Sequence, residues 1–129
     1  MARFLLICLG GAMGTGLRYL VSGLAARWLG ADFPYGTLIV NLSGSFVIGV
    51  IQEIGVRSLL IPDSVRLLLT VGVMGGLTTY STFSYETVRF MELGAWHEAW
   101  VNIIVTTVAC LTLCFVGIAV GRLLVGLRG

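Results

Sequence analysis

Four long apolar stretches, separated by short connectors that carry prolines and charges, constrain this chain more than any other feature. They cover approximately residues 4–24, 36–60, 67–90 and 100–127. Each is long enough to cross the hydrocarbon core of a bilayer as a helix, which takes about 20 predominantly apolar residues. Only 11% of the 129 residues are charged, too few to cover the surface of a water-soluble domain. The sequence therefore predicts an all-α integral membrane protein with one four-helix transmembrane domain, residues 1–129.

The few charged and sulfur-bearing residues argue against several other classes. The net charge of +2 is too small, and the arginines are too scattered, for a nucleic-acid-binding surface. The three cysteines all lie in apolar stretches, so we expect no disulfide framework. The single histidine, His97, is remote from them in sequence, which leaves no convincing metal-binding spacing. No motif for nucleotide binding or hydrolysis is visible, and we do not expect an enzyme.

The arginines give a modest indication of membrane topology. With four spans, both termini and the second connector share one side of the membrane. The arginines expected there outnumber those expected opposite: Arg3, Arg57, Arg66, Arg122 and Arg128 against Arg27, Arg89 and the nearby Arg18. Because short cytoplasmic segments carry the excess of basic residues, this count favours termini in the cytoplasm.

Glycines recur at a spacing of four in the first and last spans, at Gly10, Gly14, Gly117 and Gly121. Small residues at this spacing let the backbones of membrane helices approach closely, so we expect tight helix contacts. Four thin helices enclose little volume of their own. Either the protein forms an oligomer, or it has no transport pathway at all.

The third stretch contains an unusual polar segment, GGLTTYSTFSYE, from Gly75 to Glu86. Gly75 and Gly76 each cost about 1 kcal/mol against alanine in a helix interior. Thr78 and Thr79 add β-branched crowding and hydroxyls that compete for backbone hydrogen bonds. Together they predict a break in the third helix, whose freed carbonyl groups can coordinate a cation. The alternative is a tight helix crossing with threonines bonded back to the preceding turn, and the local sequence leaves both open.

Two aromatic residues in this segment, Tyr80 and Phe83, are three apart and share a helix face. The hydroxyl residues around them are Thr79, Ser81, Thr82 and Ser84. Aromatic ring edges carry partial positive charge and can face an anion, and hydroxyl groups can donate to it. Ordinary packing is the alternative for this pair.

Further polar residues lie within or at the edges of the spans. Asn41, early in the second span, offers two donors that suit an anion, although it could equally join two helices. A mildly polar stripe at a spacing of four runs along the fourth span: Asn102, Thr106, Cys110 and Cys114.

Two charged residues lie closer to the ends of the spans. Arg18 could extend its guanidinium to the interface or place a positive charge at a water-filled mouth. Glu86 could pair with an arginine or line a polar exit. The sequence does not separate these alternatives.

Three sequence segments together make a recognisable family pattern: GGAMGTGLRY in the first span, PYGTLIVNLSGSFVIG in the second and TVGVMGGLTTYSTFSYE in the third. The chain resembles the Fluc/CrcB fluoride ion channels over essentially its whole length, and the third segment is highly specific. The resemblance implies passive export of cytoplasmic fluoride across the bacterial inner membrane and hence fluoride resistance.

The resemblance also implies an assembly and a set of sites. Such channels are antiparallel, dual-topology homodimers with two pores along the subunit interface. A sodium ion (Na⁺) lies at the dimer centre, held by backbone carbonyls that match Gly75 and Thr78. The fluoride path maps to Asn41, Tyr80 and Phe83 with the neighbouring hydroxyls, and its polar track falls on Cys110 and Cys114. The vestibule arginine maps to Arg18.

Two departures from the family pattern concern conduction more than fold. Tyr80 stands where phenylalanine is common and adds a hydroxyl, and Cys110 and Cys114 stand where serine or threonine is usual. The arginine bias also departs from the near-equal charge that dual insertion prefers. A heterodimer with an oppositely biased partner is therefore an alternative to the homodimer.

Two functions from other classes are compatible with four spans. A small proton-coupled multidrug antiporter needs a carboxylate near the membrane midplane, and Glu86 is the acid closest to a span centre. A non-transporting membrane scaffold needs no such group, but leaves the glycine pair and the hydroxyl cluster without a role.

Overall fold

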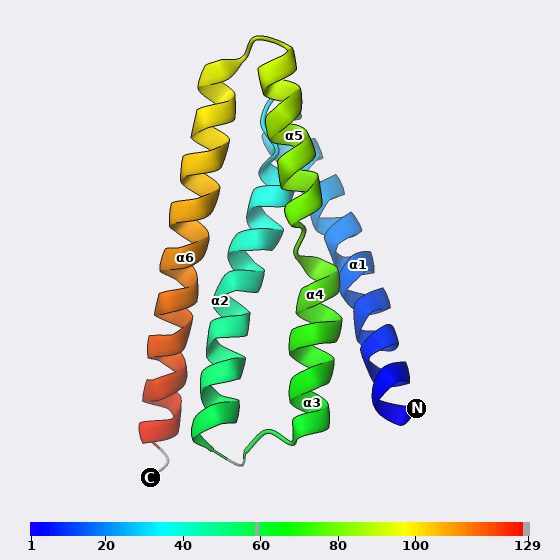
Figure 1. Ribbon diagram of the computed structural model, residues 1–129, viewed down its shortest axis with the longest axis vertical. Helices are drawn as coiled ribbons and strands as arrows, with labels where there is room; N and C mark the ends of the chain where they lie inside the picture. Colours follow the sequence, from blue (N-terminus) through cyan, green and yellow to red (C-terminus); the bar gives the residue numbers. More distant parts are fainter. Residues whose placement is uncertain (59, 128–129) are drawn as a thin grey trace.

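The computed structural model describes residues 1–58 and 60–127 and confirms the all-α fold. Arg128, which contributes to the predicted topology, lies outside the described residues. Among the described residues, three helices are long and apolar enough to cross a membrane: α1 (Ala2–Leu29), α2 (Tyr35–Arg57) and α6 (Trp96–Gly126). The start of α1 and the end of α6 lie at the same end of the structure, as an even number of crossings requires (Figure 1).

The third predicted span is a stack of four short elements instead of one helix, and these elements together are called the third column. These are α3 (Asp63–Leu67), the π-helical segment η1 (Leu68–Met74), α4 (Gly75–Leu77) and α5 (Tyr80–Glu92). Between α4 and α5 the backbone is extended at Thr78 (φ −80°, ψ 155°) and Thr79 (φ −152°, ψ 111°). Figure 1 shows the ribbon leaving its helical path between α4 and α5. The predicted break is therefore present, and the π-helical segment before it was not predicted.

Most span boundaries differ from the predicted ones by a few residues. α1 and the third column extend beyond the apolar stretches at both ends, because helices continue into the headgroup region where polar residues are tolerated. α2 instead ends at Arg57, three residues before the predicted end at 60. Ser58 is extended there (φ −144°, ψ 156°), and its hydroxyl donates to the carbonyl of Ile54 at 2.8 Å.

The expected tight helix contacts are made by glycines, and they join two pairs of elements. α2 packs along α6, where a Cβ on Gly117 would lie under 3.0 Å from the carbonyl oxygen of Phe46. α1 packs against η1 and α4, where a Cβ on Gly14 would come equally close to the carbonyl oxygen of Val73. A Cβ on Gly76 would in turn meet the backbone of Gly11. Backbone thus contacts backbone at both crossings.

Side-chain burial is inverted relative to a water-soluble domain. Large apolar side chains such as Leu111 and Phe115 lie on the outside, 68% and 73% exposed. Several of the buried side chains are polar, among them Thr37, Asn41 and Asn102. This distribution fits a protein whose solvent is hydrocarbon, where polar groups must find partners inside.

Candidate functional site at the break in the third span

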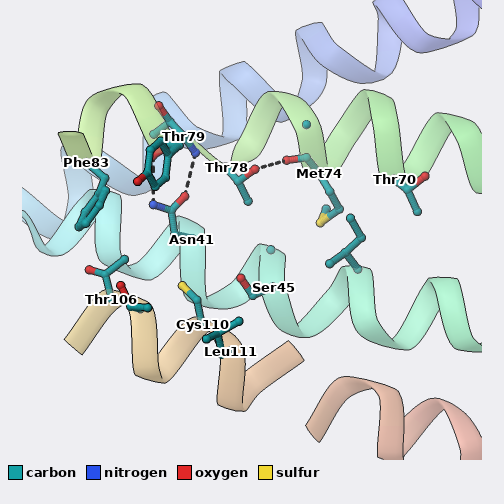
Figure 2. Close-up of a pocket in the computed structure, with 15 residues that line it drawn as sticks. Asn41, Ser45, Thr70, Met74, Thr78, Thr79, Phe83, Thr106, Cys110 and Leu111 are labelled. Carbon is teal, nitrogen blue, oxygen red and sulfur yellow. Dashed lines mark hydrogen bonds between the residues drawn. The ribbon is translucent and has the colours of Figure 1, made fainter. Parts of the chain in front are cut away.

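Asn41 of α2 holds the broken backbone through two hydrogen bonds. Its Oδ1 accepts from the backbone N–H of Thr79 at 2.8 Å, and its Nδ2 donates to the carbonyl of Thr79 at 3.1 Å. Both bonds are buried (Figure 2). Asn41 therefore joins two spans, as one of its two predicted roles required, while its amide retains a second N–H donor.

Helix α5 begins with a side-chain cap at Thr79. Its Oγ1 accepts from the backbone N–H of Thr82 at 3.2 Å and lies 2.9 Å from the Thr82 hydroxyl and 3.2 Å from that of Ser81. Threonine is a favoured residue at this position because its oxygen satisfies a donor that the first helical turn leaves free. The predicted hydroxyl cluster thus gathers at the first turn of α5.

The break leaves several carbonyl groups without their helical donors, among them the two predicted cation ligands. In a continuous helix the N–H of Thr79 would donate to the carbonyl of Gly75, and that of Thr82 to the carbonyl of Thr78. Both N–H groups instead donate to side chains, at Asn41 and at Thr79. The carbonyls of Gly75 and Thr78, the two predicted cation ligands, are therefore among those that lack a helical donor.

The alternative prediction for this segment was a tight helix crossing with threonines bonded back to the preceding turn, and it holds for the residues before the break. The hydroxyl of Thr78 donates back to the carbonyl of Met74 at 2.9 Å, and Gly76 makes a close crossing with α1. Back-bonding and tight crossing therefore coexist with the break, which they flank on its N-terminal side.

A cavity of about 420 Å³ lies beside the break, between α2, the third column and α6. Figure 2 shows side chains from all three approaching it. Those that matter for its chemistry are Asn41, Ser45, Thr78, Thr79, Tyr80, Phe83, Thr106 and Cys110. The cavity thus brings the amide of the second span, both aromatic rings and part of the fourth-span stripe to one place.

The two aromatic rings differ in burial. Their centroids are 5.5 Å apart and their planes are tilted by 47°. Phe83 is 8% exposed, whereas Tyr80 is 80% exposed and reaches outward from the same cavity. Phe83 is consequently held by the surrounding chain, while the surface around Tyr80 is open in a single subunit.

A buried hydrogen-bond network connects the backbone of Phe83 to side chains of α6. The hydroxyl of Thr87 donates to the Phe83 carbonyl at 2.7 Å, and Nδ2 of Asn102 donates to the Thr87 hydroxyl at 2.9 Å. Thr106 then donates to Oδ1 of Asn102 at 3.3 Å. Asn102 is 1% exposed, and the network ties α5 to α6 at the level of the cavity.

The two charged residues predicted near the span ends, Arg18 and Glu86, contact different parts of the structure. Nη1 of Arg18 reaches the carbonyl of Thr78 at 3.5 Å, so its charge lies beside the break. Oε1 of Glu86 accepts from the hydroxyl of Thr37 at 2.8 Å, while its Oε2 is buried with no hydrogen-bond partner among the described residues. Of the two predictions for Glu86, pairing with an arginine does not occur within the described part of the chain.

Comparison with known proteins decides the family. Residues 5–118 match the family described as "CrcB-like protein, Camphor Resistance (CrcB)". The chain belongs to the CrcB-like family. It is 51% identical over 124 residues to a "Fluoride-specific ion channel FluC" of Geobacter sp. (strain M21), a match that covers 96% of this chain and 100% of the relative. A protein of the same name from Anaeromyxobacter sp. (strain K) is 48% identical over 126 residues, covering 98% of this chain and 100% of the relative.

Membership of the CrcB-like family, with bacterial relatives and apolar helices of spanning length, places the chain in the inner membrane as a multi-pass protein. The predicted family resemblance is thereby confirmed over nearly the full length.

Some predicted residues of this CrcB-like chain do not line the main cavity. Cys114 lines a neighbouring cavity with Gln52 and Glu53. The Ser84 hydroxyl donates back to the carbonyl of Tyr80 at 2.9 Å. Sequence reasoning missed Thr87, because only the packing of α5 on α6 reveals its role between Asn102 and Phe83.

Proposed function

We propose that this chain forms a fluoride-selective channel that lets cytoplasmic fluoride leave the cell passively. The observation that carries the proposal is the near-complete match, at 51% identity, to a relative named as a fluoride-specific ion channel. The cavity at the break supplies groups that suit the same anion.

Fluoride is small and strongly hydrated, so a pore must replace its water with donors at close range. The free N–H of Asn41 and the ring edge of Phe83 line one cavity and can supply such contacts. Neither group carries a full charge. Conduction needs sites that bind weakly enough to release the ion, and these groups meet that need.

The carbonyls of Gly75 and Thr78 are the groups that would hold Na⁺. They fit a cation because the break deprives both of their helical donors, and an unpaired carbonyl within the membrane is costly. When bound, Na⁺ supplies a fixed positive charge that favours anions nearby.

A single chain offers few ligands for a dehydrated cation, and a second copy would add the same carbonyls. Gly75 is exposed, and a Cβ there would meet little within the subunit, so this surface is free to meet another chain. We propose an antiparallel, dual-topology dimer that carries two pores along its interface. The homodimer is the simpler assembly, and the arginine bias keeps a heterodimer as the alternative.

The decisive experiment measures fluoride and chloride efflux from proteoliposomes that contain only this chain. We expect rapid fluoride efflux with little chloride efflux, and loss of fluoride efflux in Phe83→Ile. The matched control is Phe4→Ile, because Phe4 is exposed near the start of α1 and lines no part of the cavity.

The possible outcomes separate the parts of the proposal. No fluoride efflux from the unmodified chain rejects the homodimeric channel, and recovery with a second, oppositely oriented chain would select the heterodimer. Undiminished efflux in Phe83→Ile rejects the aromatic role alone. A proton-coupled cation flux that disappears in Glu86→Gln would point to the antiporter.

A further inference from the structure

Cys110 and Cys114 form a pair of thiols along the groove between α2 and α6. They are four residues apart on α6, so they share a face with their Cβ atoms about 5–6 Å apart. Cys110 lines the main cavity, and Cys114 lines the neighbouring cavity of about 280 Å³. Ile48 lines both, so the two cavities are neighbours along the same stretch of α2 and α6.

Both thiols are free to bind a ligand. Neither forms a disulfide, and both are partly accessible. The side-chain hydrogen bonds of the described residues involve neither sulfur, in contrast to the threonines of the same helix. The pair thus has no structural task that a bound ion would disrupt.

The surroundings select the kind of ion. Within residues 1–58 and 60–127, no three residues of the histidine, cysteine, aspartate and glutamate types cluster closely enough to hold a metal. Glu53, the acid that lines the cavity with Cys114, is engaged by Arg57 and Arg122. A cation that needs four ligands, such as zinc, or one that prefers oxygen, such as calcium, is therefore poorly served here. Two sulfurs suit a soft cation that is satisfied with two thiolates.

We propose that Cys110 and Cys114 together bind one thiophilic divalent cation, with Hg²⁺ as the representative ion. Two S–H bonds break, two sulfur–metal bonds form and two protons leave to water, with no oxidation or reduction. The product is a neutral bis-thiolate. Neutrality matters because a net charge within the membrane is expensive, whereas this complex adds none.

The bound ion would lie between the two neighbouring cavities that the thiols line and would narrow any ion path through them. This consequence rests on the proposed channel function, since obstruction is observed only if the path conducts. The binding itself does not rest on it. The family resemblance implies serine or threonine at these two positions, so the thiol pair distinguishes this chain from the pattern it otherwise follows.

The binding experiment uses the full chain with Cys8→Ser, which leaves only the pair. Cys8 lies exposed on α1, away from the groove. Hg²⁺ is titrated into the purified protein while free thiols are counted with a chromogenic disulfide reagent. We expect both thiols to disappear at one Hg²⁺ per chain, and the affinity to fall at least 100-fold when either Cys110→Ser or Cys114→Ser is added. Disappearance of one thiol per Hg²⁺, with two equivalents needed, would overturn the shared site.

The transport experiment compares fluoride efflux with and without one equivalent of Hg²⁺ for each variant. In the Cys8→Ser chain we expect at least a tenfold reduction, reversed by an added dithiol. With both Cys110→Ser and Cys114→Ser, the ratio of the two rates should stay near one. An unchanged rate despite full binding would reject obstruction but keep the site. A chain that shows no efflux at all rejects the channel, and the thiol count still tests the site.

Discussion

Replacing Gly14 with alanine should leave the protein less stable than the same change at Gly16, which should stabilise it. Both glycines lie in α1, so alanine gains the same helix propensity at each, about 1 kcal/mol. A Cβ at Gly14 would lie under 3.0 Å from the Val73 carbonyl oxygen, a backbone atom that cannot rotate away. A Cβ at Gly16 meets nothing within 4 Å.

The expected magnitude follows from the difference between the two variants. The helix-propensity gain cancels, so what remains is the cost of forcing α1 away from η1, and overpacking of this kind costs about 1–3 kcal/mol. Gly16→Ala should therefore be about 1 kcal/mol more stable than the unmodified chain. Gly14→Ala should lie about 1–3 kcal/mol below Gly16→Ala.

The measurement is the free energy of unfolding in detergent micelles, obtained from denaturant titrations of the three chains. Gly23→Ala provides a second control, since a Cβ there also meets nothing within 4 Å. Equal stability of Gly14→Ala and Gly16→Ala would refute the close crossing of α1 with the third column.

Three further predictions concern the site. Thr79→Val removes the cap of α5 and should lower the free energy of unfolding by about 1 kcal/mol, while Thr112→Val, which removes only an exposed bond within α6, should change it by less than about 0.5 kcal/mol. Asn102→Leu should cost about 1–2 kcal/mol through the two buried bonds it loses, with a lowered thermal midpoint as the readout, and an unchanged midpoint would contradict the network behind Phe83. Exchange of Na⁺ for a bulky organic cation should lower the unfolding free energy of the dimer by about 2.7 kcal/mol if Na⁺ was present at 100 times its Kd. Equal stability in the two salts would count against the sodium site.

Several features were predictable because they depend on local chemistry alone. The length and hydrophobicity of the apolar stretches indicate a multi-pass membrane protein, since a bilayer accepts little else. A break was one of two interpretations that the local sequence left open, because two glycines and two adjacent threonines weaken a helix from within but also suit a tight helix crossing. The family pattern was readable for the same reason, as its motifs are contiguous in sequence.

Other features depend on which spans meet, and only the tertiary structure decides them. Asn41 was compatible with several partners until α2 packed beside the break and the amide met the backbone of Thr79. Thr87 carried no signal of its own, because its partner Asn102 lies on another helix. The loss of helical donors likewise depends on tertiary structure. The N–H of Thr79 donates to Asn41 on another helix, and the N–H of Thr82 donates to the Thr79 hydroxyl.

The division follows from the solvent. Hydrophobicity drives apolar segments into the membrane, and a helix break there is costly because it frees backbone polar groups. The local sequence therefore indicates which segments enter the membrane and where a helix is weak. Hydrophobicity does not choose which helix faces belong together, because lipid satisfies an apolar side chain as well as another helix does. That choice is made by close backbone contact at glycines and by buried polar pairs, which exist only once the helices have met.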